Sequence, residues 1–485
     1  SKIHTERSSV LLFLSTFVSS SKTDRNTNTM KKTLLFISLL ILSVLSTQAT
    51  RPKYVFYIIG DGMGINQVNG TEMFYGELTG KIGPLPLLFS KFPYTTFVST
   101  YSANRGVTDS AAAGTALACG EKTNNNTIGV DADSLPIYSI AVAAQKKNIP
   151  VGIITSGEID DATPAAFFAH QINRSNRYEI GVDMLTAGFD FYAGDKFTQP
   201  SPEGKKSLYD MIPKANYTLA LGIQEYNRQS QAATKMILFP EKDFPYAIDR
   251  EPGDICLADL TRCAIDFLQQ KGNGFFLMIE GSKIDWAGHS RDGATNFREI
   301  KDLEESVKLA YDFYRKYPDE TLIIVTADHE TGGVVLGNGN YSLNLQALQY
   351  QTMSGIAFTK EIENLRKQNT EISWETIQKA LSHAFGFWSK LDLSTEQEAH
   401  LKKIYEETIH NQQGDLIKSL YENNEPIAEA AKTILNEIAE ITWSCSSHTA
   451  GYVPLYAIGL GAENFQGKLD NTDVPLLIAR IAGYE

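Results

Sequence analysis

The sequence predicts an α/β fold, a three-layer sandwich in which helices cover both faces of a central, mostly parallel sheet. Short apolar runs rich in β-branched and aromatic residues recur along the 485 residues, each followed by Gly, Asp or Ser and then by a helical pattern. Continuous apolar runs of this kind are typical of parallel strands buried on both faces. Between about residues 340 and 440 the pattern changes to charged amphipathic segments, which predicts a helical insertion.

Four of the apolar runs are the clearest strand predictions. They cover residues 54–59, 151–155, 275–279 and 321–326. In an open α/β sheet, ligands bind outside the carboxyl ends of the strands, and acidic residues stand just past several of these ends. One such residue alone is more often a helix cap or a turn residue. Several at the same edge of one sheet favour a binding site.

The predicted insertion contains three amphipathic helices, at residues 360–368, 374–387 and 396–410, with no strand expected between them. It lies between the strand that leads to His329 and the strand that follows His448. We interpret it as a structure that shapes the entrance of the site or covers a neighbouring subunit. A solvated addition without any catalytic part is the alternative.

The first 49 residues are interpreted as a leader rather than as part of the fold. Residues 30–49 match a secretory signal peptide, with a basic start at Lys31 and Lys32, an apolar stretch and a small-residue exit that predicts cleavage after Ala49. The apolar stretch falls short of the roughly 18 residues of a membrane anchor. Residues 1–29 are interpreted as a non-native leader upstream of the natural start. The catalytic domain is then 50–485, and we expect it to be secreted or periplasmic, without a membrane span.

Charge and cysteine content narrow the class of protein. A net charge of −13 argues against a protein that binds nucleic acid or anionic membranes, since either needs a clustered positive surface. The four cysteines form no C-x-x-C pair. Cys256 and Cys263 are near enough in sequence to close a small loop by a disulfide in an oxidising compartment. Four buried thiols are the alternative.

Three histidines stand in settings that suit metal binding. Asp285 and His289 are four residues apart, so a helical turn would place both side chains on one face. Asp328 and His329 directly follow a predicted strand, and His448 lies among small residues. Each pattern is weak alone, because such residues are more often structural. Their combination of carboxylate and imidazole ligands favours zinc.

A second set of candidates offers only oxygen ligands. These are Asp61, Asp161, Thr163 and Glu280. A hard cation such as Mg²⁺ prefers oxygen to imidazole or thiol. The two kinds of ligand set therefore predict two kinds of metal site.

Ser110 is the candidate nucleophile. It opens a run of small residues that should be helical, and a helix N-terminus favours a phosphoryl group. A helix N-cap is the alternative role for this serine. The sequence around it lacks the G-x-S-x-G elbow of serine hydrolases, so a metal ion would have to activate the hydroxyl.

Together these motifs resemble those of the alkaline phosphatase family, in the family's order, from about residue 53 to 461. The matching segments are 59–64, 108–112, 161–166, 280–281, 285–289, 326–329 and 448–449. The resemblance implies the alkaline-phosphatase-like form of the three-layer sandwich and a homodimer. It also implies hydrolysis of phosphate monoesters to an alcohol and inorganic phosphate through a phosphoserine intermediate, with two Zn²⁺ ions and one Mg²⁺ ion.

The resemblance assigns a role to each candidate residue. The implied ligands of one zinc ion are Asp285, His289 and His448. The implied ligands of the second zinc ion, next to Ser110, are Asp61, Asp328 and His329. The implied magnesium ligands are Asp61, Asp161, Thr163 and Glu280, so that Asp61 bridges two metals. Arg174 stands where the family keeps its phosphate-binding arginine, whose planar fork can hold two oxygens, and Asp109 would orient it.

Two positions vary within the family. Asp161 stands where many relatives have histidine, and an oxygen ligand there should favour magnesium over a third zinc. Trp286 stands where some relatives have a lysine or histidine that reaches toward phosphate, so we expect that contact to be absent.

Phosphodiesterases and sulfatases on the same fold are the nearest alternatives, because the two-zinc core alone does not choose the ester. Arg174 favours a monoester, whose extra negative oxygen needs a partner, and the local motif of sulfatases is absent. An inactive protein that only binds metal or phosphate would have no need for Ser110.

Overall fold

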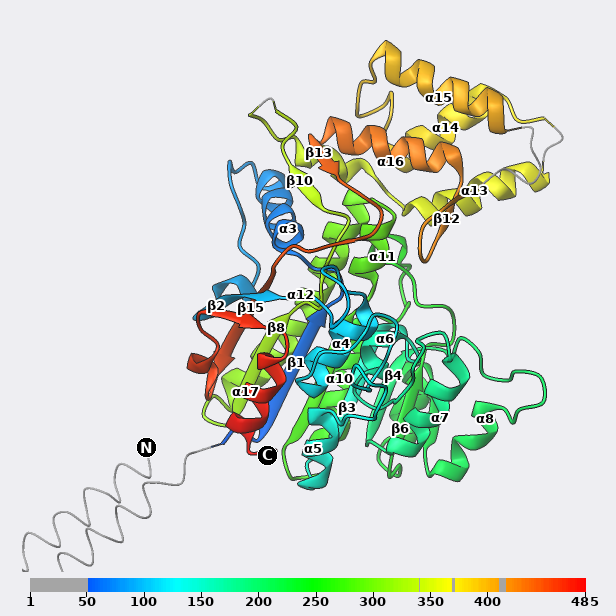
Figure 1. The fold of residues 1–485 in the computed structure, drawn as a ribbon. Coiled ribbons are helices and arrows are strands. Elements are labelled where there is room, and N and C mark those ends of the chain that lie inside the picture. The colour runs from blue at the N-terminus through cyan, green and yellow to red at the C-terminus, as the bar shows by residue number, and fades with distance from the viewer. Residues whose placement is uncertain (1–50, 340, 369–370, 410–415) are drawn as a thin grey trace, which may run out of the picture. The chain divides into compact units, whose positions relative to one another are not determined.

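The computed structural model describes residues 51–339, 341–368, 371–409 and 416–485 (Figure 1). The predicted leader at 1–29, the signal peptide at 30–49 and the cleavage point after Ala49 lie outside the described residues. Residues 51–485 cluster as one compact unit.

A ten-stranded sheet forms the centre of the described chain. Its order is β16 (Lys468–Asp470), β2 (Tyr94–Ser99), β15 (Val453–Gly459), β8 (Thr321–Thr326), β1 (Tyr54–Gly60), β7 (Phe275–Gly281), β3 (Val151–Glu158), β4 (Phe191–Asp195), β6 (Met236–Phe239) and β5 (Thr218–Leu221). Within this ten-stranded sheet, as far as the residues are described, only β15 runs antiparallel to both of its neighbours. The four strands predicted from the sequence, β8, β1, β7 and β3, lie side by side at its middle, which confirms the α/β prediction.

Successive residues of the central strand β1 face two different helical layers. Tyr57 donates a hydrogen bond to the carbonyl oxygen of Leu117 in α4 (Ser110–Cys119). The next residue back, Phe56, packs its ring edge-on against Phe313 of α12 (Gly293–Lys316). Successive side chains of a strand point to opposite faces of the sheet, so these contacts place α4 and α12 on opposite sides. Both strand residues are fully buried, as two-sided cover requires.

The remaining helices complete these layers and the sheet's outer end. Besides the two just described and those of the insertion, the described α-helices are α3 (Ile65–Leu78), α5 (Ile140–Lys146), α6 (Ala162–Ala165), α7 (Arg177–Ala187), α8 (Leu208–Met211), α9 (Gly222–Gln229), α10 (Leu257–Gln269), α11 (Lys283–His289) and α17 (Asp473–Ala482). The helix α10 packs on β3, β4 and β7, whereas α5 and α6 also reach β3. Figure 1 shows α17 and α4 in front of the sheet.

Helices dominate the described part of residues 341–440. They are α13 (Gly355–Gln368), α14 (Trp374–Phe385), α15 (Thr395–Thr408) and α16 (Pro426–Ile438). They enclose a separate apolar cluster that includes Phe358, Leu381 and Ile427, all fully buried. In Figure 1 this layer stands above the carboxyl edge of the sheet.

Among the described residues no strand lies between α13, α14 and α15, as expected, but a short hairpin that the sequence did not predict follows α15. A short hairpin pairs β11 (Ile417–Lys418) with β12 (Asn423–Asn424) in antiparallel fashion. Strands of two residues are too short to produce an alternating pattern in the sequence. Residues of this hairpin line the pocket of the candidate site.

The proposed disulfide between Cys256 and Cys263 is absent. Cys256 caps the N-terminus of α10 and Cys263 lies seven residues further on, so the helix rise separates them by about 10 Å along the axis. A disulfide requires Cα atoms within about 7 Å of each other. All four cysteines are free thiols, but only Cys263 is fully buried, so the alternative of four buried thiols is also only partly right.

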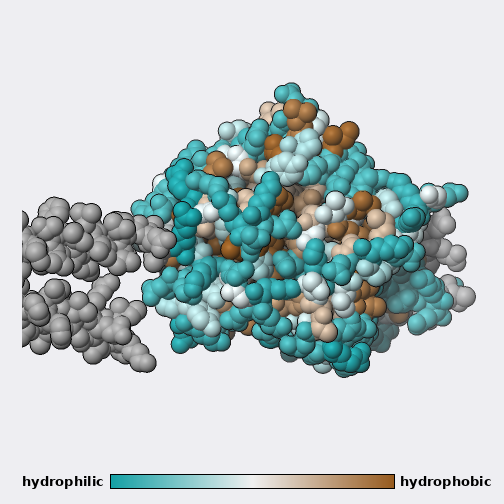
Figure 2. Space-filling model, turned by 90° about the horizontal axis from the view of Figure 1, so that it is seen from below, coloured by the Kyte–Doolittle hydropathy of each residue, from teal (hydrophilic) through white to brown (hydrophobic). Residues whose placement is uncertain are grey.

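No helix among the described residues is long and apolar enough to cross a membrane. Figure 2 shows a face on which hydrophobic residues are scattered between hydrophilic ones. Such a mixture is ordinary for the surface of a folded protein.

Candidate active site

The predicted site residues gather at the carboxyl edge of the sheet. Asp61 follows the end of β1, Glu280 is the second-last residue of β7, and Asp328 follows β8. These three strands are neighbours, and their register places Ile59 opposite both Glu280 and Thr326. The carboxylates therefore meet because parallel strands end at the same edge.

The first group of ligands consists of Asp285, His289 and His448. Asp285 and His289 lie on one face of α11, and the Oδ2 to Nε2 distance is 3.3 Å, as the four-residue spacing predicts. The Nε2 atom of His448 lies 3.5 Å from Oδ1 of Asp285 and 3.0 Å from Nε2 of His289. One ligand atom from each residue lies within 4.8 Å of the others, close enough for a single metal ion.

The second group consists of Asp61, Asp328 and His329, all buried. The Nε2 atom of His329 lies 3.3 Å from Oδ1 of Asp61 and 3.2 Å from Oδ2 of Asp328. The two groups adjoin, because the rings of His329 and His448 stack with centroids 3.6 Å apart. A short pairing of β9 (Glu330–Thr331) with β14 (His448–Thr449) brings these distant parts of the chain together.

Each of the three imidazoles is held so that Nε2 faces the group of ligands. The Nδ1 atom of His289 donates to the carbonyl oxygen of Ser446, and that of His448 donates to the carbonyl oxygen of Thr108, both at 2.8 Å. A carbonyl only accepts hydrogen bonds, so each Nδ1 carries a proton and Nε2 is the nitrogen left to bind a metal ion. This is the arrangement that fixes the tautomer of metal-binding histidines.

The third imidazole is fixed through a threonine that serves both groups. Thr331 donates its hydroxyl proton to Asp285, and its oxygen lies 3.1 Å from Nδ1 of His329. Since that proton is already given to a carboxylate, the threonine oxygen accepts from Nδ1 of His329. Thr331 therefore connects the first group to the second.

The buried carboxylates of the two groups repel each other and are arranged to bind a cation. One oxygen of Asp61, one of Asp285 and one of Asp328 is buried without a hydrogen-bond partner. Burial and the neighbouring Asp285 raise the pKa of Asp328 to about 7, and burial together with Asp328 raises the pKa of Asp61 well above its usual range. Buried like charges and unpaired oxygens are costly unless a positive ion neutralises them. The residues present therefore fit bound metal ions.

The pKa values of two of the three histidines agree with ligation by neutral rings. Burial and the facing His448 hold the pKa of His329 well below its usual value, and burial also lowers the pKa of His448. Burial opposes protonation of His289 as well, but the Asp285 carboxylate outweighs it and raises that pKa. Two of the three rings are thus neutral at pH 7, the form that binds metal.

Ser110 lies beside the second group and is only 1% exposed. Its Oγ atom is 3.1 Å from Nε2 of His329. The N-cap of α4 is Asp109, whose side chain accepts from the amide of Ala112 at 3.0 Å. The alternative role of Ser110 as the N-cap is therefore wrong, and its hydroxyl remains available at the positive end of the helix.

The contact between Ser110 and His329 is not a Ser-His-Asp triad. In a triad the carboxylate bonds to Nδ1 of the histidine and the serine faces Nε2. Here the carboxylates of Asp61 and Asp328 approach Nε2, the same atom that faces Ser110, and Nδ1 is bound to Thr331. Acceptor atoms and a hydroxyl that converge on one point are the arrangement found around a cation.

The predicted magnesium ligands are only partly in contact. Thr163 donates to Asp61 over 3.2 Å, and Glu280 accepts a hydrogen bond from Thr155. Burial raises the pKa of Glu280 to about 8. Asp161 instead faces two arginines: its Oδ1 lies 3.1 Å from Nη2 of Arg174 and 2.7 Å from Nη2 of Arg177.

Arg174 is held in place by three partners. Its Nη1 lies 3.5 Å from Oδ2 of Asp109, and its Nη2 donates to Asp161 at 3.1 Å and to the phenol oxygen of Tyr421 at 3.2 Å. Burial alone would lower the pKa of Arg174, but Tyr421 and the two carboxylates raise it. The predicted contact with Asp109 is present, although it is the longest of the three.

Four residues that contact the predicted site residues were not predicted from the sequence. They are Tyr421, Thr331, Thr155 and Arg177. Thr331 comes two residues after His329, and Thr155 is the last residue of a predicted strand. These positions in the sequence could have indicated that both threonines lie at the site. Tyr421 lies in the insertion and has no such signal.

Trp286 packs against a residue of the insertion. Its ring stacks on Tyr421 with centroids 5.1 Å apart and an angle of 21°.

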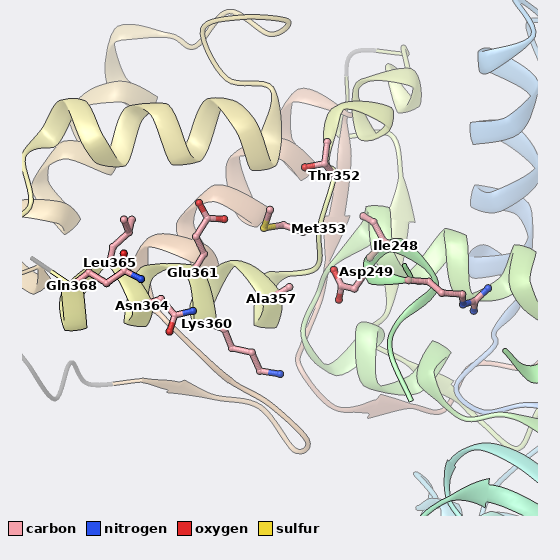
Figure 3. Close-up of a pocket in the computed structure, with 11 residues that line it drawn as sticks. Ile248, Asp249, Thr352, Met353, Ala357, Lys360, Glu361, Asn364, Leu365 and Gln368 are labelled. Atoms are coloured by element: carbon pink, nitrogen blue, oxygen red, sulfur yellow. The ribbon is translucent and has the colours of Figure 1, made fainter. Parts of the chain in front are cut away.

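The site opens into a pocket of about 740 Å³. Its lining includes Asp109, Arg174, His289 and His448 from the sheet domain, and Lys418 to Tyr421 from the hairpin of the insertion. Another pocket of about 600 Å³, shown in Figure 3, lies where α13 meets the segment around Asp249. None of the predicted site residues lines that second pocket.

Fold and site together define a metal-binding α/β protein in which a buried serine adjoins two groups of metal ligands. Comparison with known proteins gives the particular family. The family model described as alkaline phosphatase matches residues 52–199 and 203–484. Alkaline phosphatase 4 of Bacillus subtilis is 31% identical over 445 residues, which cover 88% of each chain, and alkaline phosphatase 3 of the same organism is 30% identical over 440 residues, 87% of each chain. The chain therefore belongs to the alkaline phosphatase family and is a phosphomonoester hydrolase.

Solved structures agree with this assignment. The cold-active alkaline phosphatase of the psychrophile Shewanella sp. is 27% identical, with a TM-score of 0.74, and the match covers 88% of this chain and 99% of that one. The alkaline phosphatase of Thermus thermophilus shares the fold, with a TM-score of 0.73 at 24% identity over 90% of this chain and 92% of that one. Phosphate monoesters are thus the substrates that the family implies.

Proposed function

We propose that this phosphatase works through a phosphoserine on Ser110, with two zinc ions and one magnesium ion. The first zinc ion would be held by Asp285, His289 and His448, and the second by Asp61, Asp328 and His329. Zinc ions bound there would act as Lewis acids that lower the pKa of a hydroxyl and stabilise negative charge on phosphate oxygens.

One observation carries the proposal. The hydroxyl of Ser110 and the carboxylate oxygens of Asp61 and Asp328 all approach the same ring nitrogen of His329, within 3.1 to 3.3 Å. The nucleophile is thus located at a metal-ligand group rather than beside a general base. The helix α4 starts at Ser110, so its amide groups face a phosphoryl group on that oxygen.

Arg174 is proposed to hold the phosphate. Its guanidinium presents parallel N–H groups, which match two oxygens of a phosphate monoester. A diester has one negative oxygen fewer, so a buried arginine at this position favours the monoester. Asp109 and Asp161 hold the guanidinium by ion pairs, which limits its rotation and so the entropy lost when substrate binds.

Magnesium is proposed for the oxygen ligands Asp61, Asp161, Thr163 and Glu280. Two mutants of the alkaline phosphatase from the Antarctic bacterium TAB5, in which a histidine is replaced by glutamate or aspartate, bind Mg in the M3 site. Both are 25% identical to this chain, with TM-scores of 0.64 and 0.63. Asp161 provides such a carboxylate without mutation. Since Asp161 contacts two arginines, magnesium would have to compete with Arg174 and Arg177 for that oxygen.

Hydrolysis of two chromogenic esters tests the function. The purified protein should hydrolyse p-nitrophenyl phosphate much faster than bis(p-nitrophenyl) phosphate, and a chelator should abolish the activity until zinc and magnesium are added. A preference for the bis-ester, or activity that survives complete metal removal, would refute the proposal.

Export and dimerisation are also proposed, on the basis of the signal-peptide pattern and of the family resemblance. N-terminal sequencing of secreted protein should begin directly after Ala49. Light scattering on the purified protein should give twice the mass of the cleaved chain. Material that begins at Ser1, or a mass of one chain, would contradict these two proposals.

A further inference from the structure

The hairpin of the insertion reaches the candidate phosphate site through one side chain. Residues 419–422 form its tip, closed by a hydrogen bond from the amide of Ser419 to the carbonyl oxygen of Glu422 at 2.8 Å. From this tip, Tyr421 accepts a hydrogen bond from Nη2 of Arg174 at 3.2 Å. Tyr421 and Arg174 are 247 residues apart in the chain, so the contact exists only because the insertion folds over the sheet edge.

The ring of Tyr421 is fixed from both sides of the site. One face stacks on Trp286, whose ring in turn lies 4.2 Å from the ammonium nitrogen of Lys283. The ring edge meets His289 with centroids 5.7 Å apart. Stacked aromatic pairs and a cation over an aromatic face are both attractive contacts. The ring therefore has a defined position relative to the metal ligands on α11.

The base of the hairpin is tied to the end of α11. The side chain of Asn424 donates to the hydroxyl of Ser290 at 2.9 Å, and Lys432 of α16 donates to the carbonyl oxygen of Ser290 at 2.7 Å. Both donors are almost fully buried. Because Ser290 directly follows His289, the insertion is attached at the helix that carries two ligands of the first group.

The phenol of Tyr421 remains protonated in this setting. Burial, with the nearby Asp161 carboxylate, raises its pKa well above the usual value, although Arg174 opposes the shift. Among the described contacts the phenol oxygen accepts from Arg174 and its own proton has no acceptor. The oxygen therefore acts as a neutral acceptor for the guanidinium and adds no negative charge to a site that must bind an anion.

We propose that Tyr421 is a positioning residue for Arg174, through which the helical insertion sets the affinity of the site for phosphate. This inference rests on the proposed role of Arg174 in binding phosphate. Asp109 and Asp161 hold the guanidinium from the sheet domain, and Tyr421 holds it from the insertion. The insertion is thereby part of the active site. This favours the interpretation that it shapes the entrance of the site over the alternative of a solvated addition without a catalytic part.

The substitution Tyr421→Phe tests the proposal, because phenylalanine keeps the stacked ring and removes only the acceptor. The inhibition constant of inorganic phosphate should rise about tenfold, the effect of losing one hydrogen bond to a charged group. Bound zinc, measured by atomic absorption, should stay unchanged. The matched control is Tyr405→Phe, which removes a phenol that donates to Ile372 at 2.7 Å elsewhere in the insertion and should leave phosphate inhibition unaltered.

Coupling to Arg174 separates positioning from general stability. In an Arg174→Gln background, adding Tyr421→Phe should have no further effect on phosphate inhibition, since the partner is gone. Equal effects in both backgrounds, an unchanged inhibition constant in Tyr421→Phe, or loss of zinc in that variant would each overturn the inference. Failure of the proposed function is distinguishable, because the unmodified enzyme would then show no metal-dependent hydrolysis of p-nitrophenyl phosphate.

Discussion

The hydroxyl of Thr331 gives a sharp test of how the two ligand groups are built. Thr331 is fully buried, donates to Asp285 of the first group and accepts from Nδ1 of His329 of the second. The substitution Thr331→Val keeps the shape of the side chain and removes both hydrogen bonds. Without its acceptor, the proton of His329 is free to move to Nε2, where it would block metal binding.

The size of the effect follows from these two lost contacts. Removing a residue that orients a metal ligand lowers metal affinity by about 10-fold to 100-fold. That range equals about 1.4 to 2.8 kcal/mol, which agrees with the cost of one buried polar group left without a partner. Because Thr331 contacts both groups, affinity should fall for both zinc ions rather than for one.

Zinc titration of the metal-free protein against a competing chelator measures this effect. Thr331→Val should bind both zinc ions more weakly, and Thr331→Ser, which keeps the hydroxyl, should bind them almost as the unmodified protein does. Unchanged zinc affinity in Thr331→Val would refute the reasoning that this threonine fixes the ligands. Loss of one zinc ion alone would refute its role as a connection between the groups.

Three further predictions follow from the same geometry. Metal-free protein should lose thermal stability as pH rises from about 6.5 to 8. The pKa of Glu280 is raised to about 8, so in this range the folded chain holds a proton that the unfolded chain has released, and a rise in pH favours unfolding. Below the ordinary histidine pKa of about 6.5, the buried neutral histidines have the opposite effect on stability, and above it that effect ends. Calorimetry with and without zinc checks it, since bound metal should remove the fall, and a flat profile without metal would contradict it. Trp286→Lys should alter the inhibition constant of phosphate, because the ring that supports Tyr421 is replaced by a cation, and unchanged product inhibition would count against this. A thiol assay on unreduced, unfolded protein should find four free cysteines, and two would restore the disulfide between Cys256 and Cys263.

The strands and the ligands at their ends could be predicted from the sequence because both follow from local patterns. The four central strands are continuous apolar runs, and residues such as Asp61 and Asp328 come directly after them. Parallel strands then bring these residues to one edge without further information. The pair Asp285 and His289 depended only on the helical spacing that α11 shows.

The rest of the site depends on pairings too short or too distant to leave a pattern. His448 reaches the site through a two-residue pairing in which it lies opposite Thr331. Tyr421 depends on a hairpin with strands of two residues and on the docking of the insertion at Ser290. Ser110 was ambiguous in sequence between nucleophile and helix cap, and only the side chain of Asp109, which occupies the cap, decides between them.

Labelling of the nucleophile tests the central claim most directly. The protein, loaded with zinc and magnesium, would be incubated with ³²P-phosphate at acid pH, denatured, digested and analysed by mass spectrometry. Phosphate should be found on the peptide that contains Ser110, on that residue, and no label should remain after Ser110→Ala. Label on another residue, or label retained by Ser110→Ala in an otherwise active enzyme, would contradict the account.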